Sequence, residues 1–97
     1  MRIAIEKWAR QTLRNLKDRK AMNKLESAID ELEARGFHAS NIKSISGADG
    51  IYRKRIGRYR ILFTLEKETE AIHVWIIEIK KDPRDYYKWV KQIERGL

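Results

Sequence analysis

Two runs of strand-forming residues, 51–56 and 59–66, are separated by only two residues, and this spacing constrains the fold more than any other feature of the sequence. A two-residue connection between strands predicts an antiparallel hairpin, and a glycine in its first position, here Gly57, favours a type II′ turn. The type and length of the turn fix the register of the two strands. Arg55 should therefore lie directly opposite Arg60, and every other facing pair follows from that one.

The register gives the two faces of this hairpin different chemistry, because directly opposed residues share a face. One face is mostly apolar and suits packing against helices; it carries Tyr52, Ile56, Tyr59, Ile61 and Phe63. The other face carries Arg53, Arg55 and Arg60. Like charges directly across a ladder destabilise a sheet, whereas guanidinium groups bind phosphate through paired donors and a permanent charge. We interpret this second face as a phosphate site; the alternative is neutralisation by acids of the last helix, such as Asp85 or Glu94.

The N-terminal third of the chain predicts a short strand and a helical hairpin. Residues 2–5 form the strand, and residues 6–17 carry apolar side chains at helical spacing. A second helix follows over 21–35, where apolar residues recur every three or four positions. The break between the helices falls near Asp18, and Gly36 is suited to end the second one.

The C-terminal part predicts a loop, a further strand and a last helix. Residues 36–50 are rich in Gly, Ser, Asn and Asp and are predicted to form a loop. After a polar loop at 67–70, residues 71–79 have strand character. Asp82 followed by Pro83 is typical of the first turn of a helix, with the aspartate as N-cap.

Regular alternation along this further strand puts more side chains on the face of the three arginines: His73, Trp75, Ile77, Ile79 and Lys81. A one-residue slip in the register would invert that assignment. We expect Trp75 to be covered by the last helix as part of the core, rather than to stack on a base, because its apolar neighbours also need cover.

These elements predict an α+β fold, in which an N-terminal helical hairpin packs on a small antiparallel β-sheet and a C-terminal helix follows. The 97 residues fit one domain, spanning 1–97.

The charge balance indicates a polyanionic partner. Lysine and arginine number 22 against 14 acids, a formal net charge of +8, and such a balance is typical of nucleic-acid-binding proteins, although a basic surface without a partner is the alternative. Cysteine is absent, so disulfides are excluded and a reducing cytosol is expected. No apolar run approaches the ~20 residues of a membrane span, and the N-terminus lacks the pattern of a signal peptide. We expect a cytoplasmic protein without a membrane partner.

Other kinds of chemistry have little support in the sequence. His38 and His73 stand alone in different elements, without the context of a catalytic triad. No His, Asp and Glu cluster has the spacing of a metal site, and the GADG segment lacks the lysine and hydroxyl of a P-loop. We therefore expect neither a metal nor another cofactor.

Residues 45–63, ISGADGIYRKRIGRYRILF, followed by an acidic loop, a hydrophobic strand and KKDPRDYY at 80–87, resemble the core of the RelE/ParE toxin superfamily. The resemblance covers roughly residues 42–87, and the N-terminal helical hairpin matches in type. It implies a RelE-like fold and a toxin of a type II toxin–antitoxin system, neutralised by an acidic antitoxin that wraps it in a hetero-oligomer.

Within that family, the RelE branch cleaves mRNA in the ribosomal A site without a metal. Its working residues, carried over by position, are Arg53, Arg55, Arg60, Lys81 and Tyr87. The resemblance implies that Arg60 and Lys81 stabilise the charge that develops on the phosphate, that Arg53 or Arg55 positions it, and that Tyr87 transfers a proton. Arg53 and Arg55 stand where the best-known RelE has lysines.

Two further cations belong to this hypothesis. Arg84 competes with Lys81 as the last cation of the set, and Lys54, where the family usually has an apolar residue, is assigned with Arg53, Arg55 and Arg84 to phosphate and RNA binding. Two other functions remain open: a ParE-like, non-catalytic inhibitor of DNA gyrase, and a basic nucleic-acid-binding domain. The complete set of cations and tyrosine favours the endoribonuclease over both.

Overall fold

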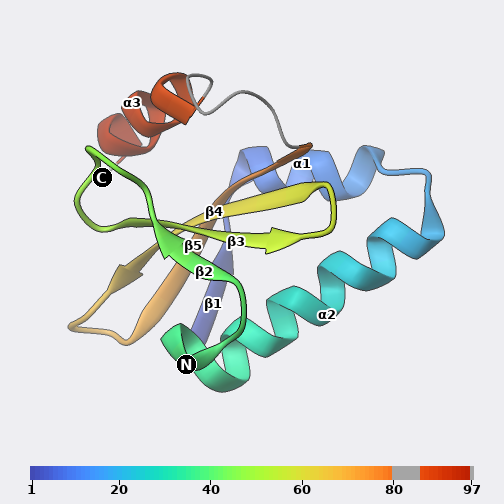
Figure 1. Ribbon diagram of the computed structural model, residues 1–97, viewed down its shortest axis with the longest axis horizontal. Coiled ribbons are helices and arrows are strands. Elements are labelled where there is room, and N and C mark those ends of the chain that lie inside the picture. The colour runs from blue at the N-terminus through green and yellow to red at the C-terminus, as the bar shows by residue number, and fades with distance from the viewer. Residues whose placement is uncertain (80–85, 97) are drawn as a thin grey trace.

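The computed structural model describes residues 1–79 and 86–96, with the backbone alone at residues 86 and 87 (Figure 1). The elements follow one another in the order β1 (Arg2–Ile5), α1 (Lys7–Asn15), α2 (Arg19–Arg35), the short 3₁₀ helix η1 (Gly36–His38), β2 (Ile42–Ser44), β3 (Ile51–Ile56), β4 (Tyr59–Glu66), β5 (Ala71–Ile79) and α3 (Tyr86–Gly96). No helix in these two stretches combines the length and apolar character of a membrane span.

A five-stranded sheet in the order β1-β5-β4-β3-β2 forms the middle of the molecule. Helices α1 and α2 lie on one side of the sheet and α3 lies on the other (Figure 1). The predicted α+β fold is confirmed, with two differences. Strand β2 lies in the segment predicted to be a loop, and β1 runs parallel to β5, whereas all the other pairs are antiparallel.

The break between the two N-terminal helices lies where the sequence places it. The Asp18 carboxylate accepts hydrogen bonds from the backbone N–H groups of Lys20 and Ala21, at 2.9 and 3.2 Å, and so caps α2. Gly36 ends α2 with a φ of 55°, a conformation that glycine adopts at little cost. A Cβ at this position would also lie 2.4 Å from the sulfur of the flexible Met1 side chain, which would have to move.

The predicted register of the central hairpin is confirmed. Ile56 pairs with Tyr59 and Arg55 pairs with Arg60, and the pairing continues without interruption to Ile51 and Thr64 at the other end of β3. The φ of Gly57 is 57°, the positive value that the first central residue of a type II′ turn needs.

The pairing of β4 with β5 contains a β-bulge that the sequence analysis does not anticipate. Leu62 pairs with Ile76, but the next residue, Phe63, pairs with Val74, so Trp75 is an extra residue on β5. An extra residue reverses the alternation of side chains on one side of the bulge relative to the other.

Beyond the bulge, the predicted faces of Ile77 and Ile79 are therefore wrong. Ile77 packs into the core beneath the helices, and Ile79 pairs with Tyr59 on that same face. Glu78 takes the position directly opposite Arg60.

The sheet separates two apolar cores. The larger one, beneath α1 and α2, includes Leu25, Leu32, Ile61, Phe63 and Val74. The smaller one, beneath α3, includes Ile51, Leu62, Trp75, Val90 and Ile93. The expectation that Trp75 is a core residue is confirmed: it is buried, and its indole N–H donates to the Thr64 hydroxyl at 2.8 Å.

Candidate functional site

Four cations from three neighbouring strands lie on the sheet face that is opposite to α1 and α2. Lys43 of β2 pairs directly with Arg53 of β3, and Arg55 of β3 pairs directly with Arg60 of β4. Because directly opposed residues share a face, these two pairs form adjacent rows. We call this set, Lys43, Arg53, Arg55 and Arg60, the arginine face.

The outer part of the arginine face is open to solvent. Lys43 and Arg55 are exposed and Arg53 is half-buried. These three side chains, with Asn41 and others, line a cavity of about 210 Å³. Two guanidinium groups and an ammonium around an open cavity suit a phosphate, because both groups donate charge-assisted hydrogen bonds to its oxygens.

Lys43 is the member of this face that the sequence analysis missed. It lies in a strand of only three residues, inside a segment rich in Gly, Ser and Asn. The alternation of Ile42, Lys43 and Ser44 is the only signal for this strand, and it is too short to stand out from a loop.

Arg60 occupies the inner end of the arginine face and is almost entirely buried, with 4% of its surface exposed. Its Nη1 donates to the backbone carbonyls of Gly57 and Tyr59, at 3.0 and 2.9 Å. These bonds hold the guanidinium at the base of the hairpin turn. Arg60 lies between Arg55 on one neighbouring strand and Glu78 on the other.

The acid that faces Arg60 in the register of the sheet is Glu78, on β5. Glu78 also accepts a hydrogen bond from the indole N–H of Trp89, on α3. Glu94 is exposed on α3, and Asp85 lies outside the described residues.

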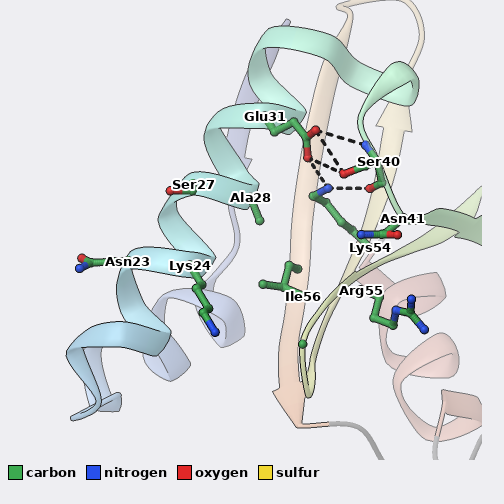
Figure 2. Close-up of a pocket in the computed structure, with 11 residues that line it drawn as sticks. Asn23, Lys24, Ser27, Ala28, Glu31, Ser40, Asn41, Lys54, Arg55 and Ile56 are labelled. Carbon is green, nitrogen blue, oxygen red and sulfur yellow. Dashed lines mark hydrogen bonds and ion pairs between the residues drawn. The ribbon is translucent and has the colours of Figure 1, made fainter.

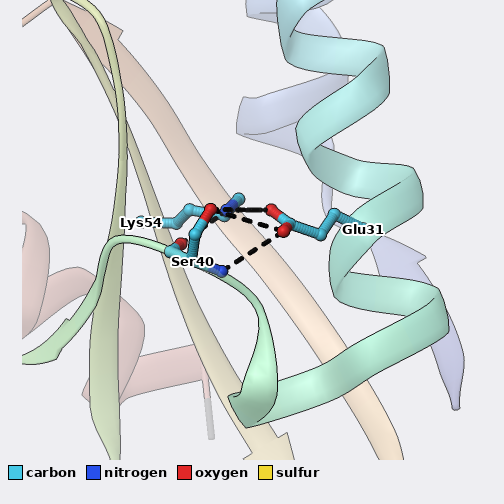
Figure 3. A network of polar contacts seen from close by, with 3 residues as sticks. All are labelled: Glu31, Ser40 and Lys54. Atoms are coloured by element: carbon cyan, nitrogen blue, oxygen red, sulfur yellow. Dashed lines mark hydrogen bonds and ion pairs between the residues drawn. The ribbon is translucent and has the colours of Figure 1, made fainter.

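Lys54 lies on the opposite face of the sheet from its two neighbours in the chain, as Figure 2 shows for Lys54 and Arg55. Its side chain is 3% exposed. Its Nζ lies 2.5 Å from Glu31 Oε1 and 2.6 Å from the Ser40 carbonyl oxygen (Figure 3). The Ser40 N–H and hydroxyl also donate to the Glu31 carboxylate, each at 3.3 Å.

This network differs from the expectation that Lys54 binds phosphate. Side chains alternate along a strand, so the residue between Arg53 and Arg55 must point toward α2. The hydrogen bond from Lys54 lowers the pKa of the Glu31 carboxyl, which keeps it ionised beside the ammonium. The role of Lys54 in this structure is to join β3, α2 and the segment before β2.

Three of the expected site residues have no described side chain. Lys81 and Arg84 are outside the described residues, and Tyr87 is described in its backbone only, in the first turn of α3. Of the expected set, the structure thus brings together Arg53, Arg55 and Arg60.

A separate polar cluster surrounds His73 on β5. Its Nδ1 lies 3.0 Å from Glu6 Oε1, and its Nε2 lies 3.1 Å from Glu66 Oε2. The hydrogen bond with Glu6, followed by the one with Glu66, raises the pKa of His73. Within residues 1–79 and 86–96, no three His, Cys, Asp or Glu side chains are grouped so that they could hold a metal.

Comparison with known proteins finds the fold rather than a close relative. No protein-family model matches the chain, and no curated protein matches it either. Among solved structures, the isolated E. coli RelE toxin superimposes with a TM-score of 0.69 at 17% identity, over 95% of this chain and 97% of that one.

Two further structures agree. RelE in the archaeal RelE–RelB complex from Pyrococcus horikoshii OT3 gives a TM-score of 0.68 at 20% identity, over 80% of this chain and 92% of that one. The YoeB/ParE toxin from Agrobacterium tumefaciens gives a TM-score of 0.71 at 14% identity, over 84% of this chain and 100% of that one. The chain therefore has the fold of the RelE/ParE toxin superfamily.

Proposed function

We propose that this chain is the toxin of a type II toxin–antitoxin system, and that it cleaves mRNA on the ribosome without a metal. The observation that carries the proposal is the arginine face. Four cations from three strands lie side by side on one face of a RelE-like sheet, and three of them, Lys43, Arg53 and Arg55, line an open cavity. A strand of mRNA is the polyanion that this fold and this charge suit together.

The proposed reaction uses the nucleophile that RNA itself provides. The 2′-oxygen forms a bond to the adjacent phosphorus as the bond from phosphorus to the 5′-oxygen breaks, leaving a 2′,3′-cyclic phosphate and a free 5′-hydroxyl. A base must take the proton of the 2′-hydroxyl, and an acid must protonate the departing 5′-oxygen. Tyr87 is our candidate for one of these proton transfers. The ordinary pKa of tyrosine, ~10, must then be lowered by neighbouring cations for it to act as a base near neutral pH.

The arginine face supplies charge and position. Arg53, which is half-buried, and Arg55, which is exposed, hold the scissile phosphate through their guanidinium groups. Arg60 stabilises the additional negative charge of the phosphorane. A guanidinium has five N–H donors, and the two carbonyl contacts of Arg60 involve Nη1. Because backbone carbonyls fix it in advance, Arg60 needs little reorganisation as the charge develops. Lys81 or Arg84 provides the last cation in this proposal.

The proposed partner is an acidic antitoxin. The P. horikoshii RelE was crystallised in complex with RelB, and a net charge of +8 favours a partner of opposite charge for this chain. The proposed compartment is the cytoplasm, where ribosomes translate mRNA.

Primer extension on mRNA from cells that express the chain tests the proposal directly. Cuts inside translated codons, absent from untranslated RNA, are the expected result. Intact mRNA accompanied by a DNA-damage response would instead support a ParE-like action on gyrase, and would overturn the endoribonuclease.

The Tyr87→Phe variant tests the catalytic step separately. It removes only the hydroxyl, and general acid–base catalysis typically contributes ~10²–10⁴ in rate. The variant should stay folded and bind RNA, but cleave ribosome-bound mRNA slower by at least the lower of these factors. Cleavage at the parental rate would exclude Tyr87 from the chemistry and leave Lys81 or Arg84 to transfer the proton.

A further inference from the structure

A groove runs between α2 and the β3–β4 hairpin, on the side of the sheet edge away from the arginine face. It has a volume of about 570 Å³. Asn23, Lys24 and Ser27 line it from the helix, and Arg55 and Ile56 line it from the strand (Figure 2). Lys24 extends from α2 toward the hairpin in this view. We call it the α2 groove.

The α2 groove adjoins the cavity of the arginine face. Both are lined by Asn41 and Arg55, which lie at the edge where the two meet. At its other end, the α2 groove shares Lys24 and Gly57 with a third depression, of about 390 Å³. A single surface path therefore leads from the arginine face, past Arg55, along the outside of α2.

Cations follow this path along its whole length, and the acids beside it are already occupied. Lys24 lines the α2 groove, and Lys20 and Arg58 line the third depression. Glu31 is bonded to Lys54, and Asp18 accepts two backbone N–H bonds as the cap of α2. In the described part of the chain, no ion pair joins Lys20, Lys24 or Arg58 to an acid.

The lining of the α2 groove suits a phosphate backbone better than a protein. Protein partners gain most of their affinity from large apolar or aromatic anchors in desolvated pockets. The apolar side chains that line the α2 groove are Ala28, which is buried, and Ile56, which is half-buried. The other lining side chains are amides, hydroxyls, three cations and the Glu31 carboxylate, which is paired with Lys54. Amides, hydroxyls and cations are the groups that bind phosphates without reading sequence.

We propose that the α2 groove carries the phosphate backbone of the same RNA strand onward from the arginine face, with Lys24 and Lys20 as its phosphate ligands. The inference rests on the proposed function, since the arginine face must bind RNA for the strand to continue. It adds a second, non-catalytic contact surface that lengthens the bound RNA without touching the bond that is cut. Affinity should therefore depend on RNA length, and the part added by a longer RNA should depend on Lys20 and Lys24.

Salt dependence of RNA affinity tests this, using a short oligonucleotide that spans the arginine face and a longer one extended at either end. Each single-strand phosphate contact contributes ~0.7 to the slope of log K against log salt concentration. The double variant Lys20→Gln/Lys24→Gln should lower the slope by about 1.4 for a longer RNA, and leave the slope for the short RNA unchanged. Both lysines are exposed on a helix, and glutamine is a good helix former, so the fold should be retained.

The matched control is Lys7→Gln/Lys67→Gln, which removes the same charge from exposed positions that line none of the three depressions. This control should leave both slopes unchanged. An equal reduction of the salt-dependence slope in the two double variants would mean that net charge acts at a distance. That result would overturn the proposal. So would unchanged RNA slopes together with weaker binding of an acidic antitoxin, because the groove would then be a protein-binding surface.

The same data separate this inference from the proposed function. If Arg55→Gln weakens binding of the short RNA while Lys20→Gln/Lys24→Gln changes neither slope, the arginine face binds RNA and only the α2 groove assignment fails. If neither RNA binds the unmodified protein, and mRNA in cells that express it remains uncut, the proposed function itself fails.

Discussion

Strand β3 carries three consecutive cations, and the middle one has a different environment from its two neighbours. Lys54 is buried against α2, with its ammonium on Glu31 and the Ser40 carbonyl. Arg53 and Arg55 point to the other side of the sheet, where they line an open cavity with Lys43. Identical charge at adjacent positions thus belongs to an internal ion pair in one case and lines an open cavity in the other.

The difference shows that alternation and partners decide the role of a charge, and that a count of charges does not. A buried ion needs a partner and further hydrogen bonds, and Lys54 has both. Arg55 is exposed, so its guanidinium requires neither a partner nor further hydrogen bonds within the protein. It lies directly opposite Arg60, and two like charges in facing positions destabilise a sheet. Arg55 is therefore free to contribute to ligand binding, whereas Lys54 contributes to stability.

The largest expected effect is the loss of stability in Lys54→Met. Removing the ammonium leaves the Glu31 carboxylate without its main partner, and an acceptor that loses its donor costs about 1–3 kcal/mol. The full cost of a buried ion pair does not apply, because the Glu31 side chain is 27% exposed and keeps its hydrogen bonds from Ser40. Urea denaturation should show this loss in the free energy of unfolding.

Two further variants control that measurement. Glu31→Met/Lys54→Met should recover much of the loss, because no charge is left unpaired. Arg55→Gln should change the free energy of unfolding by no more than about 0.5 kcal/mol, as surface substitutions usually do. Equal losses in Lys54→Met and Arg55→Gln would remove the distinction between the two sides of β3.

The next effect is on binding, in Arg55→Glu. Charge-assisted hydrogen bonds contribute about 1.5–3 kcal/mol each, and the reversal adds repulsion of the phosphate. RNA affinity should fall at least tenfold, and expression in cells should no longer be toxic, while the fold is unchanged. Full toxicity of a well-expressed Arg55→Glu protein would refute the arginine face as a phosphate site.

A fall in pH should weaken the Lys54–Glu31 ion pair before it changes the charge of the arginines. The folded-state pKa of Glu31 lies below its ordinary value of 4.5, so this carboxylate stabilises the fold above pH 4.5. That contribution is lost as the pH falls below 4.5 toward the folded-state pKa. The free energy of unfolding of Glu31→Gln, measured over the same range, should decline less steeply with falling pH than that of the unmodified protein.

The smallest effect concerns His73, whose carboxylate partners remain in contact with water. Its pKa is raised in the folded state, so its contribution is complete below the ordinary value of 6.5 and is lost as the pH rises through the folded-state pKa. Exposed pairs contribute about 1 kcal/mol or less. The unmodified protein should lose this amount of stability between mildly acidic and alkaline pH, and His73→Gln should show no such change. An identical pH profile in both proteins would mean that the imidazolium contributes nothing.

Much of the fold could be predicted because local signals agree with it. The two-residue turn at Gly57 fixes the register of β3 and β4, and Asp18 and Gly36 bound α2 as the sequence indicates. The bulge at Trp75 could not be predicted, since it depends on how a large side chain packs beneath α3. Strand β2 was missed because three residues are too few for a periodic signal.

The candidate site was predictable in part for the same reason. Arg53, Arg55 and Arg60 follow from the hairpin alone, whereas Lys43 joins them only through the pairing of β2 with β3. The partner of Lys54 is 23 residues away in the chain, on α2. No local pattern in the sequence identifies a contact of that range, so the sequence alone places Lys54 with its cationic neighbours.

The most direct test of the account compares two variants of β3 that each remove one positive charge, Arg55→Gln and Lys54→Met. The measurement is the salt dependence of affinity for a short single-stranded RNA, under conditions where both proteins are folded by circular dichroism. The account predicts that Arg55→Gln lowers the slope of log K against log salt concentration by about 0.7, the value of one lost phosphate contact, and that Lys54→Met leaves it unchanged. Equal slopes for the two variants, or no change in Arg55→Gln, would contradict the claim that the arginine face binds the phosphate.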